Sequence, residues 1–259
     1  MILVEKLNIN GIPSLHIVDK EIASKQLPFV IFVHGFTSAK EHNLHYAYLL
    51  AEKGIRVVLP EALFHGERQE GLHHKELSFR FWEIVLTTIE ELNGVKEFFE
   101  AKKWIDIDKI GLAGTSMGGI ITFGALTKYN WIHSAVSLMG SPYYQSFARM
   151  QIQEMKKRGI HLPISDVEQN KLIEQLKHYD LSLQPEKLGK RPLLLWHGKF
   201  DQVVPFEYSS QFYDTIKNKE YKVEFLADEK AGHQVSREGL LRTIDWFETH
   251  LKLQVITSK

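Results

Sequence analysis

The pentapeptide Gly114-Thr115-Ser116-Met117-Gly118 constrains the fold more than any other part of the chain. It has the spacing G-x-S-x-G and lies between an apolar run, 109–113, and a segment with helical character. A serine in this context occupies a strained position on a tight turn, and its flanking glycines avoid collisions with the neighbouring strand and helix. The pattern therefore predicts a nucleophile elbow with an exposed Ser116 hydroxyl. A glycine-rich strand-to-helix turn without chemistry is the alternative.

Two later segments supply a base and an acid. The run 191–198 is typical of a buried strand and ends in His197-Gly198, and Asp201 follows in the next loop. A second strand-like stretch, 221–226, is followed by His233. Because a serine nucleophile needs a base and a group that orients the base, these residues are candidates for both roles. The chain order Ser116, Asp201, His233 is the order found in α/β-hydrolases.

Three other aspartates compete for the role of the acid, namely Asp180, Asp228 and Asp245. Asp201 alone directly follows a buried strand that ends in a His-Gly turn. We therefore expect Asp201, rather than the other three, to orient His233.

The chain resembles the α/β-hydrolase-fold serine esterases of the dienelactone hydrolase and prolyl oligopeptidase-like branch. The resemblance covers nearly all of the chain, and it implies a serine carboxylic ester hydrolase that forms an acyl-enzyme intermediate. The segment 60–68 is also similar to a loop of small bacterial esterases, in which aspartate often takes the place of Glu61. The motifs that carry the resemblance are His34-Gly35-Phe36, the pentapeptide around Ser116, His197-Gly198-x-x-Asp201-x-x-Val204-Pro205 and Gly232-His233.

Strand-like and helix-like patterns alternate along the chain, which predicts an α/β fold with a mostly parallel central sheet flanked by helices. At 259 residues with 44% hydrophobic content, the chain can form a single α/β-hydrolase domain, 1–259. The apolar positions between 76 and 102 repeat at helical spacing and predict one long helix. The other expected elements are a hairpin over 2–9 and 12–19, strands at 28–33, 55–59 and 133–139, and a helix over 40–53.

The alternation fails between 142 and 190, where helix-like stretches occur near 143–158 and 166–178. We interpret this segment as a helical cap insertion within the single domain. Its bulky residues Tyr143, Tyr144, Phe147 and Met150 would narrow a pocket above the nucleophile, which favours short-acyl esters. An apolar helix face packed against the body explains the same residues equally well.

The oxyanion of an ester-cleaving serine enzyme needs preorganised N–H donors. The resemblance places one on Met117, directly after the nucleophile, and a second on Phe36. His34 is expected to be a packed turn residue. His65 is a candidate for contact with the substrate, although a structural role in its turn is as plausible.

Composition excludes several classes of function. The chain has 32 basic and 32 acidic residues, so no electrostatic site for nucleic acid or an anionic membrane is expected. The absence of cysteine excludes disulfides, a thiol nucleophile and cysteine-bound zinc. The N-terminal residues are not typical of a secretory signal, so a cytoplasmic location is expected. The histidine pairs His42/His45 and His73/His74 lack a third ligand, and neither a metal nor a cofactor is expected.

Other activities remain open on this scaffold. A thioesterase, a peptidase, and a cofactor-free lyase or perhydrolase would use the same residues, and a non-catalytic binding protein would need none of them. The chain length disfavours a peptidase, because 259 residues leave no room for a separate gating domain. The partner expected is a small ester, and the sequence does not indicate an oligomeric state.

Overall fold

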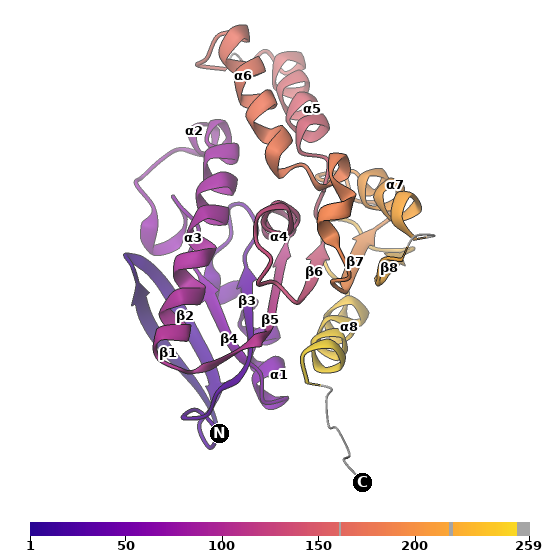
Figure 1. Cartoon of the computed structure of the whole chain (residues 1–259). Coiled ribbons are helices and arrows are strands. Elements are labelled where there is room, and N and C mark those ends of the chain that lie inside the picture. The colour runs from indigo at the N-terminus through magenta and orange to yellow at the C-terminus, as the bar shows by residue number, and fades with distance from the viewer. Residues whose placement is uncertain (161, 218–219, 253–259) are drawn as a thin grey trace.

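The computed structural model describes residues 1–160, 162–217 and 220–252, and an eight-stranded sheet organises them in the order β1-β2-β4-β3-β5-β6-β7-β8 (Figure 1). β1 (Ile2–Ile9) and β2 (Ile12–Asp19) form the predicted hairpin, and β2 pairs antiparallel with β4 (Arg56–Pro60). All remaining pairs are parallel. The prediction of an α/β fold with a mostly parallel central sheet is confirmed. The other strands are β3 (Leu27–Val33), β5 (Ile105–Thr115), β6 (Ser134–Leu138), β7 (Leu193–Gly198) and β8 (Val223–Asp228).

Helices cover both faces of the sheet, which explains why its central strands are apolar on both sides. In β3, Phe29, Ile31 and Val33 pack into one core with residues of three helices, α3 (Phe81–Ala101), α4 (Met117–Lys128) and α7 (Phe206–Ile216). The alternate residues Val30 and Phe32 pack into a second core with α1 (Leu44–Glu52) and α8 (Arg237–Phe247). This alternation is the period-two pattern of a strand.

Two helix predictions differ from the structure. The segment 40–53 begins as a 3-10 helix, Lys40–Asn43, and continues as α1 before Gly54, which has a φ of 75°. The single helix predicted over 76–102 is wrong, because the chain breaks at Arg80 into α2 (His74–Phe79) and α3. Arg80 has a ψ of 8°, and apolar spacing alone does not reveal such a change of direction. The break buries Phe81, whereas Leu77 remains only partly buried.

β5 begins at Ile105, earlier than the apolar run indicates. Leu27 pairs with Ile105 and Phe29 pairs with Ile110, so the register shifts between these two pairs. This irregularity contains residues 106–109, of which three are charged and Ile107 is exposed, and it hides the start of the strand in the sequence.

The segment between β6 and β7 contains α5 (Tyr144–Lys157) and α6 (Asp166–Leu176) at the helical stretches expected from the sequence. Figure 1 shows them as a pair that projects beyond one end of the sheet. Trp82 Nε1 of α3 donates a hydrogen bond to Gln151 Oε1 of α5 at 2.9 Å, which joins the pair to the body. The shorter helices are Gly66–Arg68, Lys177–Tyr179, Leu181–Leu183, Pro185–Leu188 and the π-helical turn Glu248–Lys252.

Among the described residues, no helix combines the length and the apolar character that a membrane span requires.

Candidate active site

Ser116 occupies a strained turn between β5 and α4. Its φ of 54° and ψ of −111° lie in a region that residues with a side chain rarely adopt. The turn leaves no space for larger flanking residues, because a Cβ atom on Gly118 would lie 2.1 Å from the Val33 carbonyl oxygen and one on Gly114 would lie 2.3 Å from the Gly118 backbone. The Ser116 N–H donates to the Leu138 carbonyl at 2.8 Å, which anchors the turn to β6.

His233 connects Ser116 to Asp201. Its Nε2 lies 2.8 Å from Ser116 Oγ, and its Nδ1 lies 2.7 Å from Asp201 Oδ2. A carboxylate accepts hydrogen bonds, so Nδ1 carries the proton in this arrangement and Nε2 is free to accept from the serine hydroxyl. The structure thus brings together three side chains that lie up to 117 positions apart in the sequence.

Asp201 is buried, and both of its carboxylate oxygens accept hydrogen bonds. Its Oδ1 accepts from the N–H groups of Val203 at 2.8 Å and Val204 at 3.0 Å. Burial would raise the pKa of Asp201, but hydrogen bonds with His197 and His233 outweigh it and hold the pKa well below its usual range. The carboxyl group is therefore ionised at neutral pH and available to orient His233.

The competing aspartates have other partners. Asp228 Oδ1 accepts from the N–H groups of Lys230 and Ala231, both at 3.0 Å, and so closes the turn that precedes His233. Asp180 accepts from the Gln145 N–H at 3.0 Å and the Ser182 N–H at 3.1 Å. Asp245 lies in α8. Of these four carboxylates, Asp201 is the one bonded to His233.

His197 is a site residue that the sequence reasoning did not assign. Its Nε2 lies 3.1 Å from Asp201 Oδ2 and 2.9 Å from the Val204 carbonyl, and its Nδ1 lies 2.8 Å from Ser209 Oγ. The fully buried ring therefore contacts the same carboxylate oxygen as His233 and ties Asp201 to α7. The sequence feature that could have revealed His197 is its i, i+4 spacing from Asp201 in the motif at the end of β7.

The two residues expected to supply oxyanion donors, Met117 and Phe36, belong to segments that border the turn at Ser116. Met117 begins α4, where the first N–H groups have no acceptor within the helix. Phe36 follows Gly35, at which a Cβ atom would lie 3.5 Å from Ser116 Cβ, so the loop after β3 is packed against the elbow. No hydrogen bond of the described residues uses the N–H of Phe36 or of Met117. The two groups are free to bind an anionic oxygen.

The structure corrects three of the four substrate contacts expected from the sequence. Tyr144 is fully buried and donates its hydroxyl proton to the Ile120 carbonyl at 2.5 Å, and Phe147 is 3% exposed in the core. Their helix face packs on the body, as the alternative interpretation stated. His65 is also buried, and backbone groups engage both of its ring nitrogens. Tyr143 alone is partly exposed, and its ring stacks on Tyr208 at 5.4 Å.

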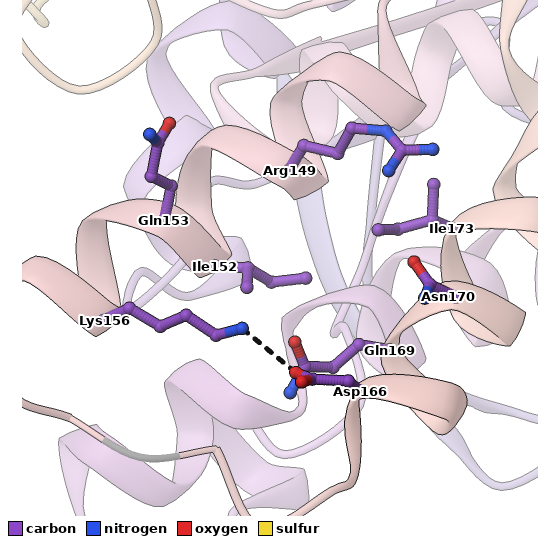
Figure 2. A pocket seen from close by; sticks show the side chains of 8 residues that line it. All are labelled: Arg149, Ile152, Gln153, Lys156, Asp166, Gln169, Asn170 and Ile173. Atoms are coloured by element: carbon purple, nitrogen blue, oxygen red, sulfur yellow. Dashed lines mark hydrogen bonds and ion pairs between the residues drawn. The ribbon is translucent and has the colours of Figure 1, made fainter.

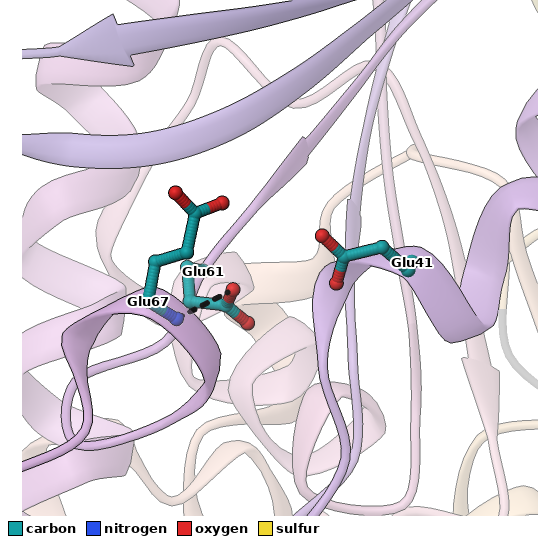
Figure 3. A group of neighbouring side chains, drawn as sticks. All are labelled: Glu41, Glu61 and Glu67. Carbon is teal, nitrogen blue, oxygen red and sulfur yellow. Dashed lines mark hydrogen bonds between the residues drawn. The ribbon is translucent and has the colours of Figure 1, made fainter.

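An ion cluster around the buried side chains of Lys40 and Glu61 supports the loop that contains Glu61, and Figure 3 shows its three carboxylates. Its carboxylates belong to Glu41, Glu61 and Glu67, and their oxygens lie within 4.8 Å of one another. The Lys40 ammonium contacts all three, at 2.9, 2.6 and 2.7 Å respectively. An ammonium at the centre accounts for the carboxylate geometry without a metal ion. A Cβ atom on Gly66 would lie 2.0 Å from the Glu61 carboxylate, so the loop is shaped around this charge.

The burial of Glu61 gives a prediction for acid stability. Burial would raise the pKa of Glu61, but hydrogen bonds with His34 and Lys40 lower it from 4.5 to about 2. Because the pKa of Glu61 is lower in the folded protein than the unfolded value of 4.5, the ionised carboxylate stabilises the fold at pH values above 4.5. This stability is lost as the pH falls toward 2. At about 1.4 kcal/mol per pKa unit, the contribution is about 3 kcal/mol. Glu61→Gln should therefore be less stable than the parent at pH 7, and the difference should shrink below pH 4.5.

The measurement is the free energy of unfolding in urea at a series of pH values for both proteins. Glu41→Gln is the matched control, because Glu41 is exposed and also contacts Lys40. A difference between Glu61→Gln and the parent that stays constant with pH would contradict the assignment.

A cavity of about 490 Å³ lies between α5 and α6 (Figure 2). Ile152 and Ile173 supply apolar surface, while Lys156 and Asp166 form an ion pair of 3.0 Å at its edge. It shares no residue with the Ser116, His233 and Asp201 group.

Comparison with known sequences identifies the family. The sequence model of the prolyl oligopeptidase family matches residues 43–254. The chain belongs to this family. Its relatives include "Putative esterase YitV" of Bacillus subtilis, which is 53% identical over 97% of this chain and 100% of that protein. "Esterase YjfP" of Escherichia coli is 30% identical, again over 97% of this chain and 100% of that protein. The family and these relatives make the chain a hydrolase and support esterase activity.

Solved structures share the fold of this family member. TT1662 from Thermus thermophilus superimposes with a TM-score of 0.77 at 21% identity and covers 98% of this chain and 100% of its own. The acylaminoacyl peptidase of Pyrococcus horikoshii gives a TM-score of 0.76 at 20% identity, over 97% of this chain but 42% of the peptidase. The prolyl oligopeptidase family member described here thus corresponds to less than half of that peptidase chain.

Proposed function

We propose that the chain is a serine carboxylic ester hydrolase that acts on small, short-acyl esters through an acyl-enzyme intermediate. One observation carries the proposal: His233 is hydrogen-bonded to Ser116 Oγ on one side and to the ionised Asp201 on the other. A nucleophile, a base and an orienting acid in this order form the arrangement of serine hydrolases.

The steps follow from these contacts. Ser116 Oγ attacks the ester carbonyl carbon, and its proton passes to His233 Nε2. The carbonyl oxygen becomes an oxyanion, which the N–H groups of Phe36 and Met117 bind. The C–O bond to the alcohol then breaks, and the alkoxide leaves with the proton held by His233. Water repeats the sequence on the acyl-enzyme, releases the carboxylic acid and restores the Ser116 hydroxyl.

Aromatic packing beside the oxyanion loop supports the preference for small esters. The Phe36 ring contacts Phe81 at a centroid distance of 5.4 Å, and Phe81 contacts Phe147 of α5 at 6.2 Å. These rings form a continuous aromatic contact from the loop after β3 to α5, so a long acyl chain on this side would have to displace them. We therefore interpret the segment 142–190 as a cap that limits substrate size through α5.

Peptidase activity is the second candidate, because the family whose sequence model matches the chain is that of prolyl oligopeptidase. We rank it second because the two relatives that match along their whole length, YitV and YjfP, carry the name esterase. An ester-cleaving enzyme needs only the residues described above.

The test compares hydrolysis of p-nitrophenyl acetate, butyrate and octanoate with hydrolysis of N-acetylalanine p-nitroanilide. We expect kcat/KM to be highest for acetate or butyrate and far lower for the anilide. A higher value for the anilide would favour the peptidase. Folded protein that hydrolyses none of them, and that does not react with a fluorophosphonate, would instead be a binding protein.

A further inference from the structure

Two buried histidines join the loop that carries Phe36 to the loop that follows β4. His34 Nε2 lies 3.0 Å from the Ala62 N–H nitrogen, and His65 Nε2 lies 2.9 Å from that of Thr37. Each loop therefore supplies one histidine that contacts the backbone of the other loop. The two rings lie 5.2 Å apart.

The other contacts of the two rings indicate which of their nitrogens carry protons. His34 Nδ1 lies 2.8 Å from the Gly35 carbonyl, and His65 Nδ1 lies 2.8 Å from the Leu63 carbonyl. A carbonyl oxygen only accepts, so Nδ1 carries a proton in both rings. His34 Nε2 also lies 3.2 Å from Glu61 Oε1, so this nitrogen faces a carboxylate as well as the Ala62 N–H. Nε2 of His65 is then the acceptor for the Thr37 N–H. Burial lowers the pKa of His65, which agrees with a neutral ring.

These contacts hold the two peptide planes on either side of Phe36. The Gly35 carbonyl and the Phe36 N–H belong to the same planar peptide group, so the bond from His34 to that carbonyl sets the direction of the N–H. His65 holds the next peptide group through the Thr37 N–H. Thr37 has a φ of 59°, a conformation unfavourable for a β-branched residue that its surroundings must maintain.

We propose that His34 and His65 are positioning residues that aim the Phe36 N–H at the oxyanion. The inference rests on the proposed serine esterase function, because only an oxyanion at Ser116 gives this N–H a role. Neither histidine touches the reacting atoms, and both act through Phe36.

A crossed pair of substitutions tests the inference. Asparagine places its amide near the position of Nδ1, and glutamine near that of Nε2. At position 34 the Nδ1 bond is the important one, so His34→Asn should retain kcat and His34→Gln should lose it. At position 65 the Nε2 bond is the important one, so the order should reverse: His65→Gln should retain kcat and His65→Asn should lose it.

The damaging member of each pair should lower kcat for p-nitrophenyl acetate by about 100-fold with little change in KM, as loss of an oxyanion donor does. It should weaken binding of an alkyl trifluoromethyl ketone, which forms a tetrahedral adduct with serine, by a similar factor. Rates are expressed per folded molecule, with the folded fraction taken from urea unfolding. This correction keeps the comparison valid where a variant is destabilised.

Equal effects of asparagine and glutamine at both positions would overturn the inference, as would losses confined to the free energy of unfolding. Ser116→Ala is assayed in parallel. Full activity of that variant would reject the proposed function itself, whereas an inactive Ser116→Ala with no crossed pattern would reject only the positioning role.

Discussion

Replacing Ser116 with alanine is expected to lower kcat/KM for p-nitrophenyl acetate by about 10⁴-fold or more, because His233 bonds no other nucleophile in the described part of the chain. The free energy of unfolding should change by less than about 1 kcal/mol, since alanine keeps the same backbone requirement and loses only the bond to His233. Urea unfolding and initial rates measure both quantities. Ser146→Ala, on the exposed face of α5, is the matched control and should retain full activity.

A glycine at the same position adds a second readout. Ser116→Gly should be as inactive as Ser116→Ala. Its free energy of unfolding should be about 1 kcal/mol higher than that of Ser116→Ala, because glycine adopts the φ of 54° without strain. Turnover near that of the parent in either variant would place the nucleophile elsewhere.

Most of the fold and the main site residues could be predicted from the sequence because each lies where a local pattern ends. Ser116 follows a buried strand and precedes a helix, and Asp201 and His233 each follow a strand of their own. In a parallel sheet these strand ends share one edge, so local patterns were sufficient to place the three residues together.

The failures have a common physical cause, which is that burial depends on contacts between distant segments. Tyr144 has the same aromatic character as Tyr143, yet one is fully buried against α4 and the other is partly exposed. His65 is held by a backbone N–H 28 positions earlier in the chain, and Glu61 by an ammonium 21 positions earlier. No periodicity in the sequence encodes these pairings.

Asp201→Asn is expected to reduce kcat by about 10⁴-fold, the size of the effect in a serine protease whose triad aspartate was changed in this way. The structure gives the reason. The N–H groups of Val203 and Val204 both point at Oδ1, so they will hold the amide oxygen of the asparagine at that position. The NH₂ group must then take the place of Oδ2 and face His233 Nδ1, which can accept only in the tautomer that protonates Nε2.

That tautomer cannot remove the proton from Ser116, so the base is lost although the geometry is kept. The same NH₂ group would also face His197 Nε2, and the variant should lose about 1–3 kcal/mol of stability. Asp228→Asn is the matched control: its Oδ1 also accepts two backbone N–H groups, but it has no bond to His233, so an amide oxygen can replace it with less than about a twofold change in kcat. If Asp228→Asn proved the damaging substitution, His233 would have to turn toward β8 in the working enzyme, and Asp201 would be a structural residue that holds the end of β7.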